Sequence, residues 1–267
     1  MAGPSTAERG ERQQESSGPP LVRGLRRLRR LRLRTIVILA LAVALLGAAV
    51  LWVLYGSPWT RVERVSVSGT RVLTPEEVRR AADVPVGDPL VSVDTGQIAA
   101  RLRRQLPRID SVRVERSWPH GIDLEVVERT AVMVEQKGGK FAEVDAAGVR
   151  FATVAEPPKG VPLLELSLSR SAASAASLRR FGEDRLVRAA VTVSGHLPAQ
   201  VAHRTRVVKV RTYDDISLEL TDGRTVAWGS GDRSREKARA LTALMKAAPD
   251  ARYFDVSVPS APASAGS

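Results

Sequence analysis

The sequence predicts an α+β protein anchored in a membrane by one N-terminal helix. Three observations support this fold class. Residues 36–55 form an apolar run of 20 residues without a charged side chain. After this run, helix and strand signals follow in the order β-α-α-β-β, and the second half of the chain adds more strand patterns and an amphipathic helix. Aromatic residues make up only 4% of the 267 residues, so the cores must be built mainly from Val, Leu, Ile and Ala.

Composition excludes several classes of protein. The chain has no cysteine, which rules out a disulfide scaffold, a thiolate metal site and a cysteine nucleophile. His120, His196 and His203 are too few and too scattered for a zinc site, so we expect no metal and no cofactor. The net charge is +12, but residues 1–34 supply half of it with nine Arg and three Glu. The charge is therefore weak evidence for nucleic-acid binding.

Residues 36–55 predict a membrane-spanning helix, because 20 residues at ~1.5 Å each cover the ~30 Å hydrocarbon core. A cleaved signal peptide has a shorter apolar region and a small-residue cleavage site, and this run matches neither feature. Trp52, Tyr55 and Trp59 lie at its end, where aromatic rings favour the membrane–water interface. By the positive-inside rule the N-terminus is cytoplasmic, because the run follows a cluster of arginines. These are Arg23, Arg26, Arg27, Arg29, Arg30, Arg32 and Arg34.

We therefore expect a disordered, basic cytoplasmic tail over residues 1–34 and a transmembrane helix over residues 35–55. The rest of the chain would lie outside the cytoplasm, as in a single-pass type II plasma-membrane protein. The Arg cluster could also touch anionic lipid.

Residues 61–130 predict a small sheet with two helices on one face. Residues 61–68 alternate valines imperfectly with charged residues, which suggests a half-buried strand. Thr74 can cap the first helix, and Glu77 completes a capping box. Asp94 is placed to cap the second helix.

The second helix has an apolar stripe of Ile98, Leu102 and Leu106, so Leu102 should lie in the core. Strand patterns over residues 110–118 and 122–127 flank a turn and predict an antiparallel hairpin. This completes the β-α-α-β-β order.

Residues 131–258 predict a mainly antiparallel β domain with a packed helix over residues 233–248. The expected strands are residues 141–145, 149–151, 206–212, 216–221, 225–228 and 253–258. Residues 178–194 are helix-like, whereas the Ser- and Ala-rich residues 167–177 fit either an ordered segment or a linker. Residues 259–267 lack a core pattern, so we expect a disordered tail.

Four motifs then point to a known family. They are Val67-Ser68-Gly69, Asp110-Ser111-Val112, Ser117-Trp118-Pro119, and the run from Ile122 to Glu128-Arg129. Their order resembles a POTRA domain, and one POTRA domain directly after a single anchor resembles the FtsQ/DivIB family of bacterial division proteins. The hairpin Asp145-Ala146-Ala147-Gly148 is similar to the start of that family's β domain.

The resemblance implies a non-enzymatic scaffold at the division septum. Its implied partners are single-span division proteins of the FtsL and FtsB/DivIC type, which connect to septal peptidoglycan synthesis. The alternative is a secretion or membrane-assembly factor, since POTRA domains also occur there. Such chains usually carry several POTRA copies or a membrane β-barrel, and this chain has one copy.

Ser234-Arg235-Glu236-Lys237 matches the S-x-x-K pattern of Ser/Lys acyl enzymes. The companion S-D-N and K-T-G motifs are absent, and capping residues are common in a helix's first turn. We therefore expect no enzyme activity.

The expected partner site is the final strand, made of Tyr253, Phe254, Asp255, Val256, Ser257 and Val258. No later segment has a strand pattern, so its outer edge should be open to β-augmentation. The N–H groups of Val256 or Ser257 would then face outward. In FtsQ relatives the end of the β domain receives FtsB-type partners in this way. The competing interpretation is an ordinary closing strand whose aromatic side chains fill the core.

Overall fold

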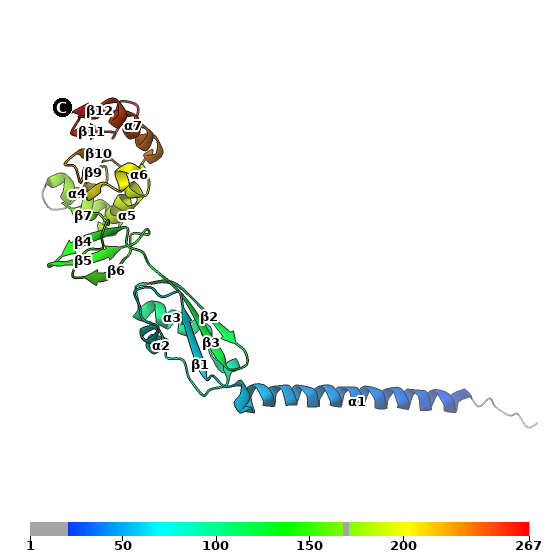
Figure 1. The fold of residues 1–267 in the computed structure, drawn as a ribbon. Helices are drawn as coiled ribbons and strands as arrows, with labels where there is room; N and C mark the ends of the chain where they lie inside the picture. The colour runs from blue at the N-terminus through cyan, green and yellow to red at the C-terminus, as the bar shows by residue number, and fades with distance from the viewer. Residues whose placement is uncertain (1–20, 168–170, 267) are drawn as a thin grey trace, which may run out of the picture.

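The computed structural model of the chain describes residues 21–167 and 171–266, and side chains within the N-terminal helix from Arg34 onward. It contains a long helix, a three-stranded sheet and a nine-stranded sheet, which follow one another along the chain (Figure 1). Residues 1–20 of the expected disordered tail lie outside the described residues.

The N-terminal helix α1 runs from Leu21 to Gly56. Its apolar part, Arg34–Gly56, is long enough to cross a membrane, and the side chains from Arg34 to Trp52 are exposed. The Arg-rich residues 21–34 are helical, so the prediction of disorder was wrong for them. Leu and Arg both favour helices, and the adjoining span removes the cost of starting a new one. The side chains of Arg23 to Arg32 lie outside the described residues.

The three-stranded sheet has the strand order β1-β3-β2. β1 (Arg64–Ser68) lies parallel to β3 (Gly121–Glu128), and β2 (Ile109–Ser117) is antiparallel to β3. Helices α2 (Pro75–Ala82) and α3 (Thr95–Gln105) come between β1 and β2. The short 3-10 helix η1 (Pro58–Thr60) precedes β1, and a second one, η2 (Leu90–Ser92), lies between α2 and α3. The predicted β-α-α-β-β order is confirmed.

The predicted helix caps are present. The Thr74 hydroxyl accepts the Glu77 N–H at 3.2 Å, and the Glu77 carboxylate accepts the Thr74 N–H at 2.8 Å. The hydrogen bonds from Thr74 lower the pKa of Glu77. The Asp94 carboxylate accepts the Gln97 N–H at 2.9 Å. Leu102 is fully buried in the core of this unit, as the apolar stripe predicts.

The nine-stranded sheet has the strand order β12-β11-β10-β9-β8-β7-β4-β5-β6. Its neighbours are antiparallel except for β4–β7, β7–β8 and β10–β11, so the sheet is mainly antiparallel. The strands are β4 (Met133–Lys137), β5 (Lys140–Val144), β6 (Arg150–Val154), β7 (Leu163–Leu166), β8 (Thr205–Thr212), β9 (Asp215–Leu220), β10 (Thr225–Gly229), β11 (Tyr253–Asp255) and β12 (Ala263–Ala265). β4, β7 and β12 have no counterpart in the sequence prediction.

Four helices accompany this sheet, where the sequence predicted two. They are α4 (Ala172–Phe181), α5 (Glu183–Ser194), α6 (Ala199–Ala202) and α7 (Ser234–Ala247). α4 and α5 contact β8, and α7 contacts β11. The Ser/Ala-rich segment from residue 171 onward is ordered, because Ser171 caps α4 and Ser177 is buried, with its hydroxyl accepting the Tyr213 N–H at 3.0 Å.

The two sheets are joined by arginine–carboxylate pairs. Arg108, just before β2, pairs with Glu143 of β5, and its guanidinium lies 5.2 Å from the ring centre of Phe151. Arg129, just after β3, pairs with Asp145. Both carboxylates are buried.

Candidate partner-binding edge

The predicted partner strand is shorter than expected and is paired on both sides. β11 ends at Asp255 rather than at Val258. On one side it lies parallel to β10, with Phe254 opposite Val226. On the other side it pairs with β12, with Phe254 opposite Ser264.

The expectation of an open edge on β11 was therefore wrong. The chain turns after Val258 and returns as β12, so the tail predicted to be disordered supplies a strand. The Arg252 N–H donates to the Gly266 carbonyl at 2.7 Å, which extends this pairing. Residues 263–265 are Ala-Ser-Ala, which has no alternation of large hydrophobic and polar side chains. This strand is held by backbone hydrogen bonds, and the sequence pattern does not reveal such bonds.

The N–H groups expected to face outward are used within the chain. The Val256 N–H donates to the Ala227 carbonyl at 2.9 Å, and the Ser257 N–H donates to the Asp255 carboxylate at 2.9 Å. The Ser257 hydroxyl donates to the same carboxylate oxygen at 2.7 Å. Substituting Val256 by proline would thus break an internal hydrogen bond.

The side chains of residues 253–258 divide between core and surface. Phe254 and Val256 are fully buried, which agrees with the interpretation of a closing strand. Tyr253 and Val258 are 39% and 54% exposed. Tyr253 and Val258 thus place apolar surface beside β12. All three side chains of β12 are exposed. The outer edge of β12 has no neighbouring strand among the described residues.

A buried lysine supports this end of the sheet from α7. The Lys237 ammonium donates to the carbonyls of Trp228 and Ser230 at 3.0 and 2.9 Å. Its burial lowers the pKa of this ammonium below the usual value of 10.5. The Ser234 hydroxyl donates to the Gly231 carbonyl at 2.7 Å. Each member of the S-x-x-K pattern is thus tied to backbone and not to the other as a nucleophile–base pair.

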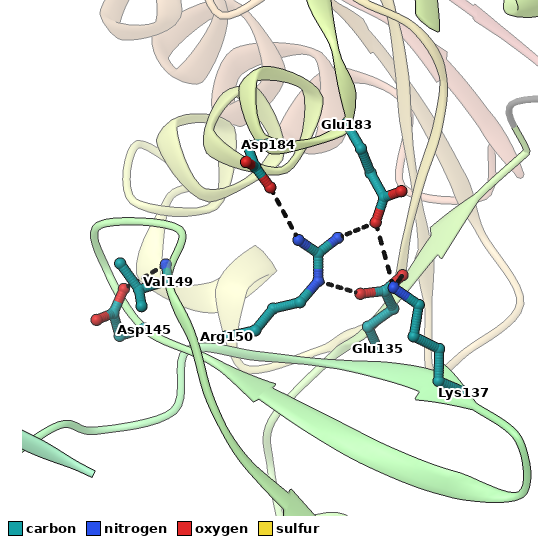
Figure 2. Close-up of polar contacts among 7 residues, drawn as sticks. All are labelled: Glu135, Lys137, Asp145, Val149, Arg150, Glu183 and Asp184. Atoms are coloured by element: carbon teal, nitrogen blue, oxygen red, sulfur yellow. Dashed lines mark hydrogen bonds and ion pairs between the residues drawn. The ribbon is translucent and has the colours of Figure 1, made fainter. Parts of the chain in front are cut away.

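The opposite edge strand, β6, begins with an arginine that gathers three carboxylates (Figure 2). Arg150 bonds to Glu135 of β4 and to Glu183 and Asp184 at the start of α5, and Lys137 also approaches Glu135 and Glu183. Burial alone would lower the pKa of Arg150, but these carboxylates raise it above its ordinary value. The cluster joins a helix to the sheet, and sequence analysis did not find it, because its members are far apart in the chain.

The histidine of the hairpin turn has a structural contact through its backbone. In the turn between β2 and β3, the His120 carbonyl accepts the N–H groups of Glu63 and Arg64, at the start of β1. Within residues 21–167 and 171–266, no group of three or more His, Cys, Asp or Glu side chains is placed to hold a metal ion.

The Glu-Arg pair at the end of β3 has two separate roles. The Glu128 carboxylate accepts the N–H groups of Arg71, Val72 and Leu73 at 2.8 to 3.2 Å, and so fixes the loop before α2. Arg129 forms the junction pair with Asp145. The sequence showed this motif as a signature without showing what its side chains contact.

Comparison with known proteins decides the family. Residues 60–129 match the model of the FtsQ-type POTRA domain, and residues 132–257 match that of the C-terminal region of cell division protein FtsQ/DivIB. A protein of Streptomyces coelicolor named cell division protein FtsQ is 70% identical over 267 residues, which cover all of both chains. The chain belongs to the FtsQ family of cell division proteins.

The chain is also similar to other proteins of this family. The FtsQ of Streptomyces collinus is 68% identical over all of both chains, and that of Mycobacterium leprae is 34% identical over 78% of this chain and 57% of its own length. The extracytoplasmic domain of DivIB from Geobacillus stearothermophilus aligns at 14% identity with a TM-score of 0.31, over 49% of this chain and 94% of that domain.

The FtsQ family match ends near the candidate edge. The matched region stops at residue 257, whereas β12 begins at Ala263. The match therefore includes β11 but not the strand that covers it.

Proposed function

We propose that this FtsQ-family chain is a non-enzymatic, membrane-anchored scaffold of the division machinery at the septum. It would link single-span proteins of the FtsL and FtsB/DivIC type to septal peptidoglycan synthesis. One observation carries the proposal: the sheet ends, far from α1, at β11, which among the described residues is covered on its outer side only by the three-residue strand β12 (Figure 1). Such edges accept partner strands through backbone hydrogen bonds.

The proposed topology is type II, with the N-terminus in the cytoplasm and both sheets outside the plasma membrane. The apolar part of α1 and the seven arginines from Arg23 to Arg34 support it. Protease added outside, after removal of the cell wall, is expected to digest residues 58–267 and to spare the N-terminal tail. Protection of both sheets from the protease would contradict this topology.

We place the partner on β11, where an incoming strand displaces β12. β12 is paired through only three residues, and none of its side chains is buried, so its loss removes little buried surface. A longer partner strand would replace these backbone hydrogen bonds and would also cover Tyr253 and Val258. The site then keeps the exposed side chains of Tyr253 and Val258, with β12 as a removable cover.

Truncation after Ser260 tests this arrangement. The truncated chain should bind an FtsB-type partner at least as tightly as the full chain in a pull-down from membranes, because the cover is gone. Tyr253→Ser should weaken binding, whereas Val149→Ser, at a similarly exposed residue before β6, should not. Circular dichroism would check the fold of each variant. Loss of binding on truncation would show instead that the partner pairs with β12 itself.

A further inference from the structure

The exposed tryptophans of this chain gather near one end of α1. The chain has four tryptophans, and Trp228 is fully buried in the larger sheet's core. Trp52 lies in α1 and Trp59 in η1 just after it, and both are 69% exposed. Trp118, in the turn between β2 and β3, is 53% exposed. It lies at the same end of α1, although it is 62 positions beyond Gly56 in the sequence.

The link from α1 to the first sheet is tied back onto the helix. The Thr60 hydroxyl donates to the Val53 carbonyl in α1 at 2.8 Å, and Thr60 is buried. α1 also contacts η2. These contacts hold the first sheet against the end of the span, so Trp59 stays near the last turn of α1.

The β2–β3 turn is fixed to the same end by contacts from two sides. The His120 carbonyl accepts the Glu63 N–H at 2.9 Å, only seven residues beyond Gly56. The Arg116 guanidinium donates to the carbonyls of Leu90 and Val93, at 3.1 and 2.7 Å, and so ties the end of β2 to η2. Figure 1 shows this hairpin pointing back toward the end of α1.

We propose that Trp118 rests in the interfacial layer of the membrane and makes, with Trp59, a second contact between the first sheet and the lipid. This inference depends on the membrane anchor of the proposed function. Tryptophan favours the headgroup level because its ring is apolar and its N–H is polar. The headgroup layer extends ~5–7 Å beyond the hydrocarbon core on each side, so a turn held beside the helix end falls within it.

The charges near this surface indicate which lipid chemistry matters. Three basic and four acidic side chains on the elements around the turn are exposed and nearly offset one another: Arg61, Arg64 and Arg116 against Glu63, Asp88, Glu115 and Asp123. The contact should therefore rest on the aromatic rings and should not require anionic lipid. Zwitterionic phosphatidylcholine vesicles are then a sufficient test membrane.

The absence of cysteine allows a clean test in the full chain. Three single-cysteine variants, Trp118→Cys, Val127→Cys and Trp52→Cys, are labelled with an environment-sensitive fluorophore and reconstituted in phosphatidylcholine vesicles with a nitroxide quencher on the lipid. Val127 is an exposed residue at the far end of the same hairpin, and its label is the matched control. We expect several-fold stronger quenching at residue 118 than at residue 127.

Quenching at residue 118 as weak as at residue 127, with strong quenching at residue 52, would overturn the inference and leave the anchor intact. That result would leave this surface to a protein partner, which is absent from the vesicles. Weak quenching at residue 52 as well would overturn the anchor and the inference together. A second measurement keeps the native ring: Trp118→Phe should lower the share of tryptophan emission quenched by brominated lipid, and an unchanged share would refute the contact.

Discussion

Replacing Arg129 by alanine tests whether the junction between the two sheets is a structural joint. The Arg129 side chain is 19% exposed, and that of its partner Asp145 is 7% exposed, so the substitution leaves a buried carboxylate without its cation. Removing one member of a buried ion pair typically costs ~3–5 kcal/mol. Asp145 keeps two backbone donors, the N–H groups of Ala147 and Val149 at 2.8 Å, which lowers the expected cost to about 2–3 kcal/mol.

Arg113→Ala is the matched control. Arg113 pairs with Glu115 and Glu125, but all three side chains are at least 60% exposed, so its loss should cost less than ~0.5 kcal/mol. The double variant Arg129→Ala with Asp145→Asn should recover much of the lost stability. It removes the unpaired charge, while the amide oxygen still accepts the turn's N–H groups.

Urea denaturation of the full chain in detergent, with hydrogen exchange followed separately in residues 60–129 and 132–257, measures these effects. The exchange data show which sheet loses stability, since a chain with two sheets need not unfold in one step. Equal costs for Arg129→Ala and Arg113→Ala would refute the assignment of Arg129 to a structural joint. Failure of the double variant to recover stability would show that the arginine acts through packing instead.

Two further predictions concern buried side chains. Leu102→Ala should cost ~2–5 kcal/mol in the same denaturation assay through lost burial and a cavity, while Val72→Ala at an exposed valine should stay within ~0.5 kcal/mol. Because burial lowers the pKa of Lys237, the unfolded chain binds more protons than the folded chain between that lowered pKa and 10.5. Stability should therefore rise with pH across this window. In the Lys237→Met variant, the melting temperature should rise less with pH than in the unchanged chain. Identical pH profiles of melting temperature for the two proteins would contradict this.

The sequence predicts the first sheet and its helices well, because their signals are local. The capping box at Thr74 and the stripe through Leu102 each lie within one element, so short stretches of sequence reveal them. β4 escapes prediction because Glu135 is buried in it and breaks the hydrophobic pattern. That burial is possible because two cations pair with the carboxylate: Arg150, 15 residues later, and Lys137.

The candidate edge shows the same limit more sharply. The sequence correctly directs attention to Phe254 as part of a strand, but it cannot show that Ser264 lies opposite. Backbone pairing between two short strands depends on how the chain returns after Val258, and the small residues of β12 would fit a disordered tail equally well. Long-range pairing, rather than any local pattern, decides whether this edge is open.

Two polar contacts of this chain lie where one part of the structure joins the next. Thr60 ties α1 to the first sheet, and Arg129 ties the first sheet to the second. An apolar joint can adopt several packings, whereas a buried ion pair is stable only while its two groups stay in contact, so we expect this pair to fix the geometry of the joint. A scaffold that presents a sheet edge to a membrane-bound partner needs that edge at a fixed height and angle. We therefore expect Arg129→Ala to weaken partner binding in membranes more than binding of a free partner peptide, because the edge itself stays intact while its position is lost.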